Sequence, residues 1–198
     1  MRNVMRILEG AAQASLVAAL AERGATDLTE VEPLVRRIVR NVRRNGDRAL
    51  RRYATQWDGL DQGEPLRVRE ADLQDAWERT DPELQDAIKQ AAGNIRRYAE
   101  WQAPKDKEKE WRREIQPSVF VGQLVRPLES VGCYVPGGRY PLPSTLLMTV
   151  IPAQVAGVKQ IRVASPRPAQ ATLAAAAFLG VREFYRVGGA QAIAALAY

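Results

Sequence analysis

Residues 131–144 read VGCYVPGGRYPLPS, and the pattern of the whole chain changes at this stretch. The residues before it are rich in charge and spaced as in helices, whereas the residues after it alternate between apolar strand-like and helix-like segments. The stretch itself is a short apolar run that ends at Tyr134, followed by a loop with Pro136, Gly137 and Gly138. In open α/β sheets, ligands bind in such loops at the carboxyl ends of strands. We therefore predict the functional site here.

The residues that follow predict a parallel sheet. Strands are expected at 131–135, 160–165 and 183–187, and helices at 144–156, 169–179 and from 189 onward, with Ser144 as the cap of the first. Apolar strands joined by helices of this length imply right-handed crossovers and a sheet covered on both faces. The fold class is therefore α/β, a helical N-terminal region followed by an incomplete Rossmann-like parallel sheet. Because its third strand–helix unit stops at Tyr198, we expect the chain to be a piece of a longer protein.

The N-terminal region predicts helices at 11–22, 30–45, 47–57 and 72–79, with Gly46 as a break. A longer helix is expected at 82–103, where Asp81 is a cap and Pro82 occupies the first helical position. Residues 66–68 form a short strand candidate, the KDKEKE run at 105–110 is expected to be a solvated loop, and a β-rich run starts at Ser118. The predicted division is a helical region, 1–110, and the Rossmann-like domain, 111–198.

The composition excludes several kinds of chemistry. The 198 residues include one cysteine, Cys133, and no histidine. An internal disulfide, a thiolate-rich zinc site, and a Ser-His or Cys-His nucleophilic pair are therefore impossible within this chain. No apolar run approaches the roughly 18 residues that span a bilayer. We expect a soluble, cytoplasmic protein without membrane partners.

The net charge of +6 raises the possibility of nucleic-acid binding, as does the arginine-rich segment 36–52. Residues 1–129, however, hold 23 Lys and Arg against 22 Asp and Glu, while residues 130–198 hold 6 against one, Glu183. The excess charge thus lies outside the arginine-rich segment. We interpret that segment as a solvated or partner-facing helix surface and expect no nucleic-acid partner. Nucleic-acid binding remains the weakest alternative.

Two loops carry the candidate binding residues, one after each outer predicted strand. Paired glycines permit close approach of a ligand, and the helix that follows offers free N–H groups to phosphate, which suits a dinucleotide. Neither loop matches GxGxxG, and a Gly-Gly pair is also compatible with a plain tight turn. Tyr134 could contact a base or ribose or pack at the strand end, and Gln191 could contact a nucleotide or cap the helix that Gly189 begins. Cys133 points away from Tyr134 and is expected to be buried.

The segments RPLESVGCYVPGGRYPLPSTLLMTVIPAQVAGVKQI and LGVREFYRVGGAQAIAALAY closely resemble the first half of histidinol dehydrogenase. The helical segment RRIVRNVRRNGDRAL is also similar to that family, so the resemblance covers nearly the whole chain. It implies an NAD-dependent, zinc-containing oxidoreductase of histidine biosynthesis that works as a homodimer. Such enzymes oxidise L-histidinol to L-histidine in two hydride transfers.

By this resemblance, the family's cofactor-contacting residues are Tyr134 and Gln191, and the NAD-binding domain is 111–198. Pro136, Gly137, Gly138 and Gly189 complete the predicted cofactor set. The family's zinc ligands and catalytic residues would lie beyond Tyr198, so we expect no catalytic and no metal-binding residue in this chain and no activity of the chain alone. The alternative is a non-catalytic dinucleotide-binding or dimerising module.

Overall fold

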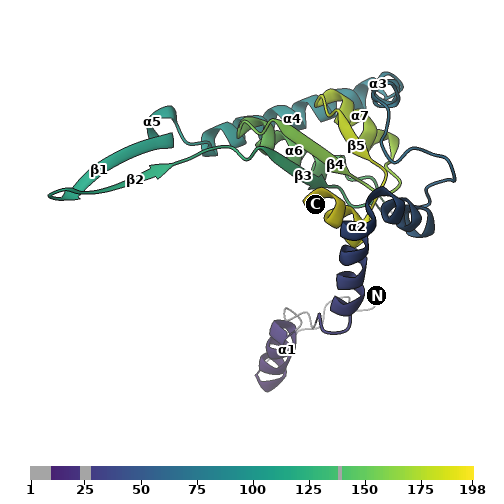
Figure 1. The fold of residues 1–198 in the computed structure, drawn as a ribbon, viewed down its shortest axis with the longest axis horizontal. Coiled ribbons are helices and arrows are strands. Elements are labelled where there is room, and N and C mark those ends of the chain that lie inside the picture. The colour runs from purple at the N-terminus through teal and green to yellow at the C-terminus, as the bar shows by residue number, and fades with distance from the viewer. Residues whose placement is uncertain (1–9, 23–27, 138–139) are drawn as a thin grey trace. The chain divides into compact units, whose positions relative to one another are not determined.

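The computed structural model describes residues 10–22, 28–137 and 140–198, and the chain divides into two compact units, Met1–Arg37 and Ile38–Tyr198. The helices are α1 (Ala11–Glu22), α2 (Glu32–Tyr53), the π-helical turn η1 (Ala54–Asp58), α3 (Glu70–Glu78), α4 (Pro82–Gln102), α5 (Asp106–Lys109), α6 (Pro143–Val155), α7 (Gln170–Phe178) and α8 (Gly189–Ala197). The strands are β1 (Glu110–Gln116), β2 (Val119–Leu124), β3 (Ser130–Tyr134), β4 (Gln160–Ala164) and β5 (Glu183–Tyr185). Figure 1 shows these elements along the chain.

The predicted parallel sheet is confirmed, in the strand order β3-β4-β5. Its register places Cys133 beside Val163 and Val163 beside Phe184, so one residue from each strand forms a row across the sheet. The predicted strand at 66–68 is a single antiparallel bridge of Arg67 to Tyr185 at the β5 edge. Two backbone hydrogen bonds of 2.8 and 2.7 Å flank this bridge.

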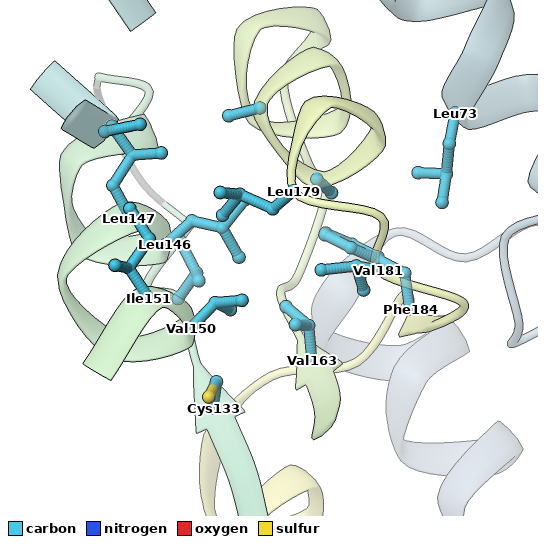
Figure 2. Close-up of a cluster of buried hydrophobic side chains, with 14 of the residues drawn as sticks. Leu73, Cys133, Leu146, Leu147, Val150, Ile151, Val163, Leu179, Val181 and Phe184 are labelled. Atoms are coloured by element: carbon cyan, nitrogen blue, oxygen red, sulfur yellow. The ribbon is translucent and has the colours of Figure 1, made fainter. Parts of the chain in front are cut away.

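Each face of the sheet is covered by helices, as predicted for this fold class. The row of Cys133, Val163 and Phe184 packs against α6 and α7, with Leu73 of α3 in the same cluster (Figure 2). The next residue of each strand points the other way, because side chains alternate along a strand. Tyr134, Ala164 and Tyr185 therefore join a second cluster with residues of α2 and α8. Burying a large apolar side chain such as that of Phe184 contributes about 1.5–3 kcal/mol to folding.

Gly132 sets the distance between β3 and α8. A Cβ at this position would lie 2.7 Å from the Cβ of Leu196, closer than two carbon atoms can pack. Only a glycine therefore lets α8 approach this strand as it does. The packing places the first turn of α8 beside the carboxyl end of β3, where the site lies.

Several local predictions are confirmed. The side chain of Asp81 accepts a hydrogen bond of 2.8 Å from the Glu83 N–H, and Pro82 begins α4. Gly46, at φ 51° and ψ −136°, interrupts the helical backbone of α2. Cys133 is buried, with 5% of its surface exposed. None of the helices in the described parts of the chain is both long and apolar enough to cross a membrane.

Two local predictions are wrong, and one strand is not predicted at all. Ser144 does not cap α6, because Pro143 already occupies the first helical turn and Leu142 is the capping residue, without a side-chain hydrogen bond. The 105–110 run is not a loop, since its middle forms α5. Strand β1 was not predicted, and it pairs antiparallel with β2 in a hairpin whose residues are all exposed (Figure 1).

Candidate functional site at the carboxyl edge of the sheet

The loops after the three parallel strands contact one another through Pro166. A Cβ added at Gly137 would lie 2.2 Å from the carbonyl oxygen of Pro166, and one added at Gly188 would lie 2.6 Å from its Cγ. Both distances are far shorter than van der Waals contact. These two glycines therefore allow the protein's own loops to meet. The sequence pattern predicts instead that such glycines make room for a ligand.

Tyr134 connects the first of these loops to the third. Its ring is half-buried against the second core cluster, and its hydroxyl oxygen accepts a hydrogen bond of 3.2 Å from the Gly189 N–H. Gly189 has a φ of 58°, in the left-handed region where glycine is favoured. Of the two alternatives for Tyr134, packing at the strand end is thus confirmed, while contact with a base or ribose stays a prediction.

Asp58 is the residue of this edge that sequence reasoning missed. It is the last residue of η1, and Gly59 follows it in a left-handed conformation with φ 68°. Only 8% of Asp58 is exposed. Its Oδ2 atom accepts hydrogen bonds from the Gly188 N–H at 2.8 Å and from Nε2 of Gln191 at 3.2 Å. A carboxylate beside the amino end of α8 is also favoured by the helix dipole.

Gln191 lies in the first turn of α8, as predicted, but its side chain is 2% exposed. Asp58 and Tyr134 accept hydrogen bonds from the N–H groups of Gly188 and Gly189. These are the N–H groups that the sequence pattern predicts to bind phosphate. Pro136 lies beside Gly137 in the first loop, whereas Gly138 lies outside the described residues. The structure thus brings Tyr134, Gln191 and Gly189 together at one edge.

Two hollows adjoin this edge. One of about 300 Å³ is lined by Asp58, Gly59, Arg167 and Arg186 among others. The other, of about 180 Å³, lies between the end of α2, α8 and the sheet. Small-molecule sites typically occupy about 300–1,000 Å³. The larger of the two lies at the lower limit of that range and is lined by Asp58, but neither hollow is lined by Tyr134 or Gln191.

Larger hollows lie elsewhere on the molecule. One of about 670 Å³ is at the amino ends of β4 and β5, and one of about 750 Å³ is beside the base of the β1–β2 hairpin. Neither is lined by Tyr134, Gln191 or Asp58. These larger hollows therefore lie apart from the edge at which the loops, the buried carboxylate and the buried amide meet.

Two arginines near the edge form ion pairs with carboxylates. Arg186, with a side chain 19% exposed, contacts Glu64 at 3.0 Å and Asp72 at 4.0 Å. The guanidinium of Arg69 hydrogen-bonds Asp72 and holds the pKa of that carboxyl below its usual range.

Burial raises the pKa of the Cys133 thiol, and a hydrogen bond to Thr149 only partly opposes this rise. The thiol is therefore neutral at physiological pH.

The described residues offer no set of ligands for a metal ion. Within 10–22, 28–137 and 140–198 there is no cluster of three or more His, Cys, Asp or Glu side chains, and the sequence contains no histidine. Zinc in proteins is held by three or four such ligands. The residues present therefore do not fit the zinc that the family resemblance implies.

A parallel sheet with helices on both faces defines the doubly wound α/β class, in which ligands bind at the carboxyl edge of the sheet. The comparisons with known proteins identify the family within that class. Residues 21–198 match the family model for histidinol dehydrogenase, and the chain belongs to this family.

The chain is 44% identical over 188 residues to the histidinol dehydrogenase of Methanothermobacter thermautotrophicus, covering 92% of this chain and 43% of that protein. It is 48% identical over 166 residues to that of Geobacillus kaustophilus, covering 81% and 38% respectively. The crystal structure of histidinol dehydrogenase from Elizabethkingia anophelis superposes with a TM-score of 0.74 at 32% identity, over 86% of this chain and 39% of that one. The chain thus spans less than half the length of the relatives it matches.

Proposed function

We propose that this chain forms one part of the NAD site of a histidinol dehydrogenase, an oxidoreductase that converts L-histidinol to L-histidine. The observation that supports the proposal is the cluster of Tyr134, Gly189 and Gln191 at the carboxyl edge, in a chain of this family. We infer that the half-buried ring of Tyr134 packs on the cofactor, while Pro136 and Gly137 shape the loop beside it. NAD, when bound, would accept the hydride.

The assignment of different roles to two regions of the chain is also a proposal. We propose a helical region, 1–110, and a cofactor-binding part, 111–198, because Tyr134 and Gln191 both fall in the second. Asp58 then links the two, since it comes from the first and bonds Gly188 of the second. We further propose a homodimer and a cytoplasmic location, on the ground of the family and of a lone reduced cysteine. Sedimentation of the purified chain tests the dimer.

Calorimetric titration with NAD tests the cofactor proposal. Stacking of an aromatic ring on a base contributes about 1–3 kcal/mol. Tyr134→Ala should therefore weaken NAD binding roughly 5- to 150-fold, whereas Tyr134→Phe, which keeps the ring, should lose less. Tyr98→Ala is the matched control, because Tyr98 is an exposed tyrosine on α4, away from the edge. Equal affinities for the wild-type chain and Tyr134→Ala would contradict the proposed role of the ring.

The activity of the isolated chain is a separate measurement. The chain has no histidine and, in its described part, no metal-ligand cluster, so we expect no histidinol-dependent formation of NADH. Turnover by a preparation free of any full-length enzyme would show that the catalytic groups are present after all. Binding of NAD without turnover is expected both for one part of the enzyme and for a dinucleotide-binding module.

A further inference from the structure

Asp58 and Gln191 form a buried pair that joins two distant parts of the chain. The carboxylate lies at the end of η1 and the amide lies in the first turn of α8, 133 positions later. Both side chains are almost completely buried, at 8% and 2% exposed. The same oxygen of Asp58 also holds the Gly188 N–H, so one atom fixes a backbone group and a side chain together.

This pair determines which way the amide of Gln191 faces. Nε2 of Gln191 donates its hydrogen bond to Oδ2 of Asp58, so the nitrogen of the amide points to the carboxyl group. The amide oxygen is then the atom nearer to Gly189, where an added Cβ would be 2.8 Å from Oε1 and 3.2 Å from Nε2. Gly189 is exposed, whereas Gly188 is buried. Although Gln191 is only 2% exposed, the oxygen is therefore the end of its amide that lies nearer to the exposed Gly189.

We infer that Asp58 is a positioning residue for Gln191. It orients the amide so that an acceptor oxygen, and not the NH2 group, is turned toward the cofactor edge. The ligand group that pairs with Gln191 is then a donor, an O–H or N–H of the dinucleotide. This inference rests on the proposed function for the role of Gln191, but the orientation of the amide stands without it.

The orientation is tested without any ligand by NMR of the side-chain amide protons. In the wild-type chain the Gln191 NH2 protons should exchange slowly with water, because they are buried against Asp58. In Asp58→Ala they should lose protection. In Asp58→Asn protection should largely return, since the asparagine carbonyl can accept in place of Oδ2. Fast exchange of the Gln191 NH2 protons in the wild-type chain would overturn the inference.

The coupling to the cofactor is tested by NAD titration of folded variants. We expect Asp58→Ala to weaken NAD binding about tenfold, the effect of one misplaced hydrogen bond, and Asp58→Asn to recover most of that loss. Because Asp58 acts through Gln191, the double variant Asp58→Ala/Gln191→Ala should bind no more weakly than Gln191→Ala alone. Asp86→Ala is the control, since Asp86 is an exposed aspartate of α4 that pairs with Lys89 at the surface.

The outcomes separate the two proposals. If the wild-type chain does not bind NAD, the proposed function fails for this chain, and the proton exchange still decides the orientation of the amide. If NAD binds but Asp58→Ala leaves its affinity unchanged, the positioning role is refuted while the cofactor site stands. Additive losses in the double variant would show that Asp58 acts by a route other than Gln191.

Discussion

Gly188→Ala tests whether the loops after β4 and β5 are packed as described. The new Cβ would lie 2.6 Å from Cγ and 2.7 Å from Cβ of Pro166, and 3.0 Å from Oδ1 of Asp58. Two of these neighbours belong to a rigid ring, so the loops must separate to admit the methyl group. Overpacking of this kind costs about 1–3 kcal/mol. The backbone of Gly188, at φ −126°, suits alanine, so the cost is steric.

Urea denaturation followed by circular dichroism measures this cost. We expect a lower midpoint for Gly188→Ala with an unchanged slope, because the surface exposed on unfolding stays the same. Gly93→Ala is the matched control. Gly93 lies in α4 with no atom within 4 Å of an added Cβ, so the same substitution should stabilise the chain by about 0.5–1 kcal/mol. A midpoint for Gly188→Ala at or above that of the wild-type chain would refute the loop contact.

Three further outcomes are expected. The Cys133 thiol should react with iodoacetamide only as the chain unfolds, because it is buried and its pKa is raised, so rapid labelling of the native chain at neutral pH would contradict its placement. Since Arg69 lowers the pKa of Asp72 in the folded chain, the pair stabilises the fold above the carboxyl's ordinary pKa of 3.8 and loses this effect as the pH falls below it. Acid titrations should therefore show a smaller loss of stability at low pH in Asp72→Asn than in the wild-type chain. Phe184→Ala should cost about 3–5 kcal/mol in urea denaturation, because Phe184 is fully buried, and a cost below 1 kcal/mol would exclude it from the core.

The parallel sheet could be predicted from sequence because its information is local. The strands are short apolar runs, each followed by a helix of predictable length, and the alternation of Cys133 and Tyr134 already separates the two faces. Strand β1 could not be predicted in this way. Its sequence, EWRREIQ, lies in an exposed hairpin with neither face buried, so no alternation of apolar and polar residues marks it. Its partner β2 is what defines it.

The candidate site could be predicted in part. The loop after β3 and the first turn of α8 were marked by glycines and by Tyr134, and the structure brings them together. Asp58 could not be found, because an Asp-Gly pair reads locally as a turn and its partners lie 130 and 133 positions away. The packing role of Gly137 and Gly188 could not be predicted either, because Pro166 approaches them only in the folded chain.

The meeting of the three loops at Pro166 limits how this edge can evolve. Surface loops usually accept substitutions one at a time. Here a side chain at 137 or 188 collides with residue 166, so a new loop sequence at one position must arrive together with a change at another. The three loops should accordingly be inherited as one block, and a library randomised at these positions should yield folded chains only in correlated combinations. An edge built this way diversifies slowly, in steps of more than one mutation.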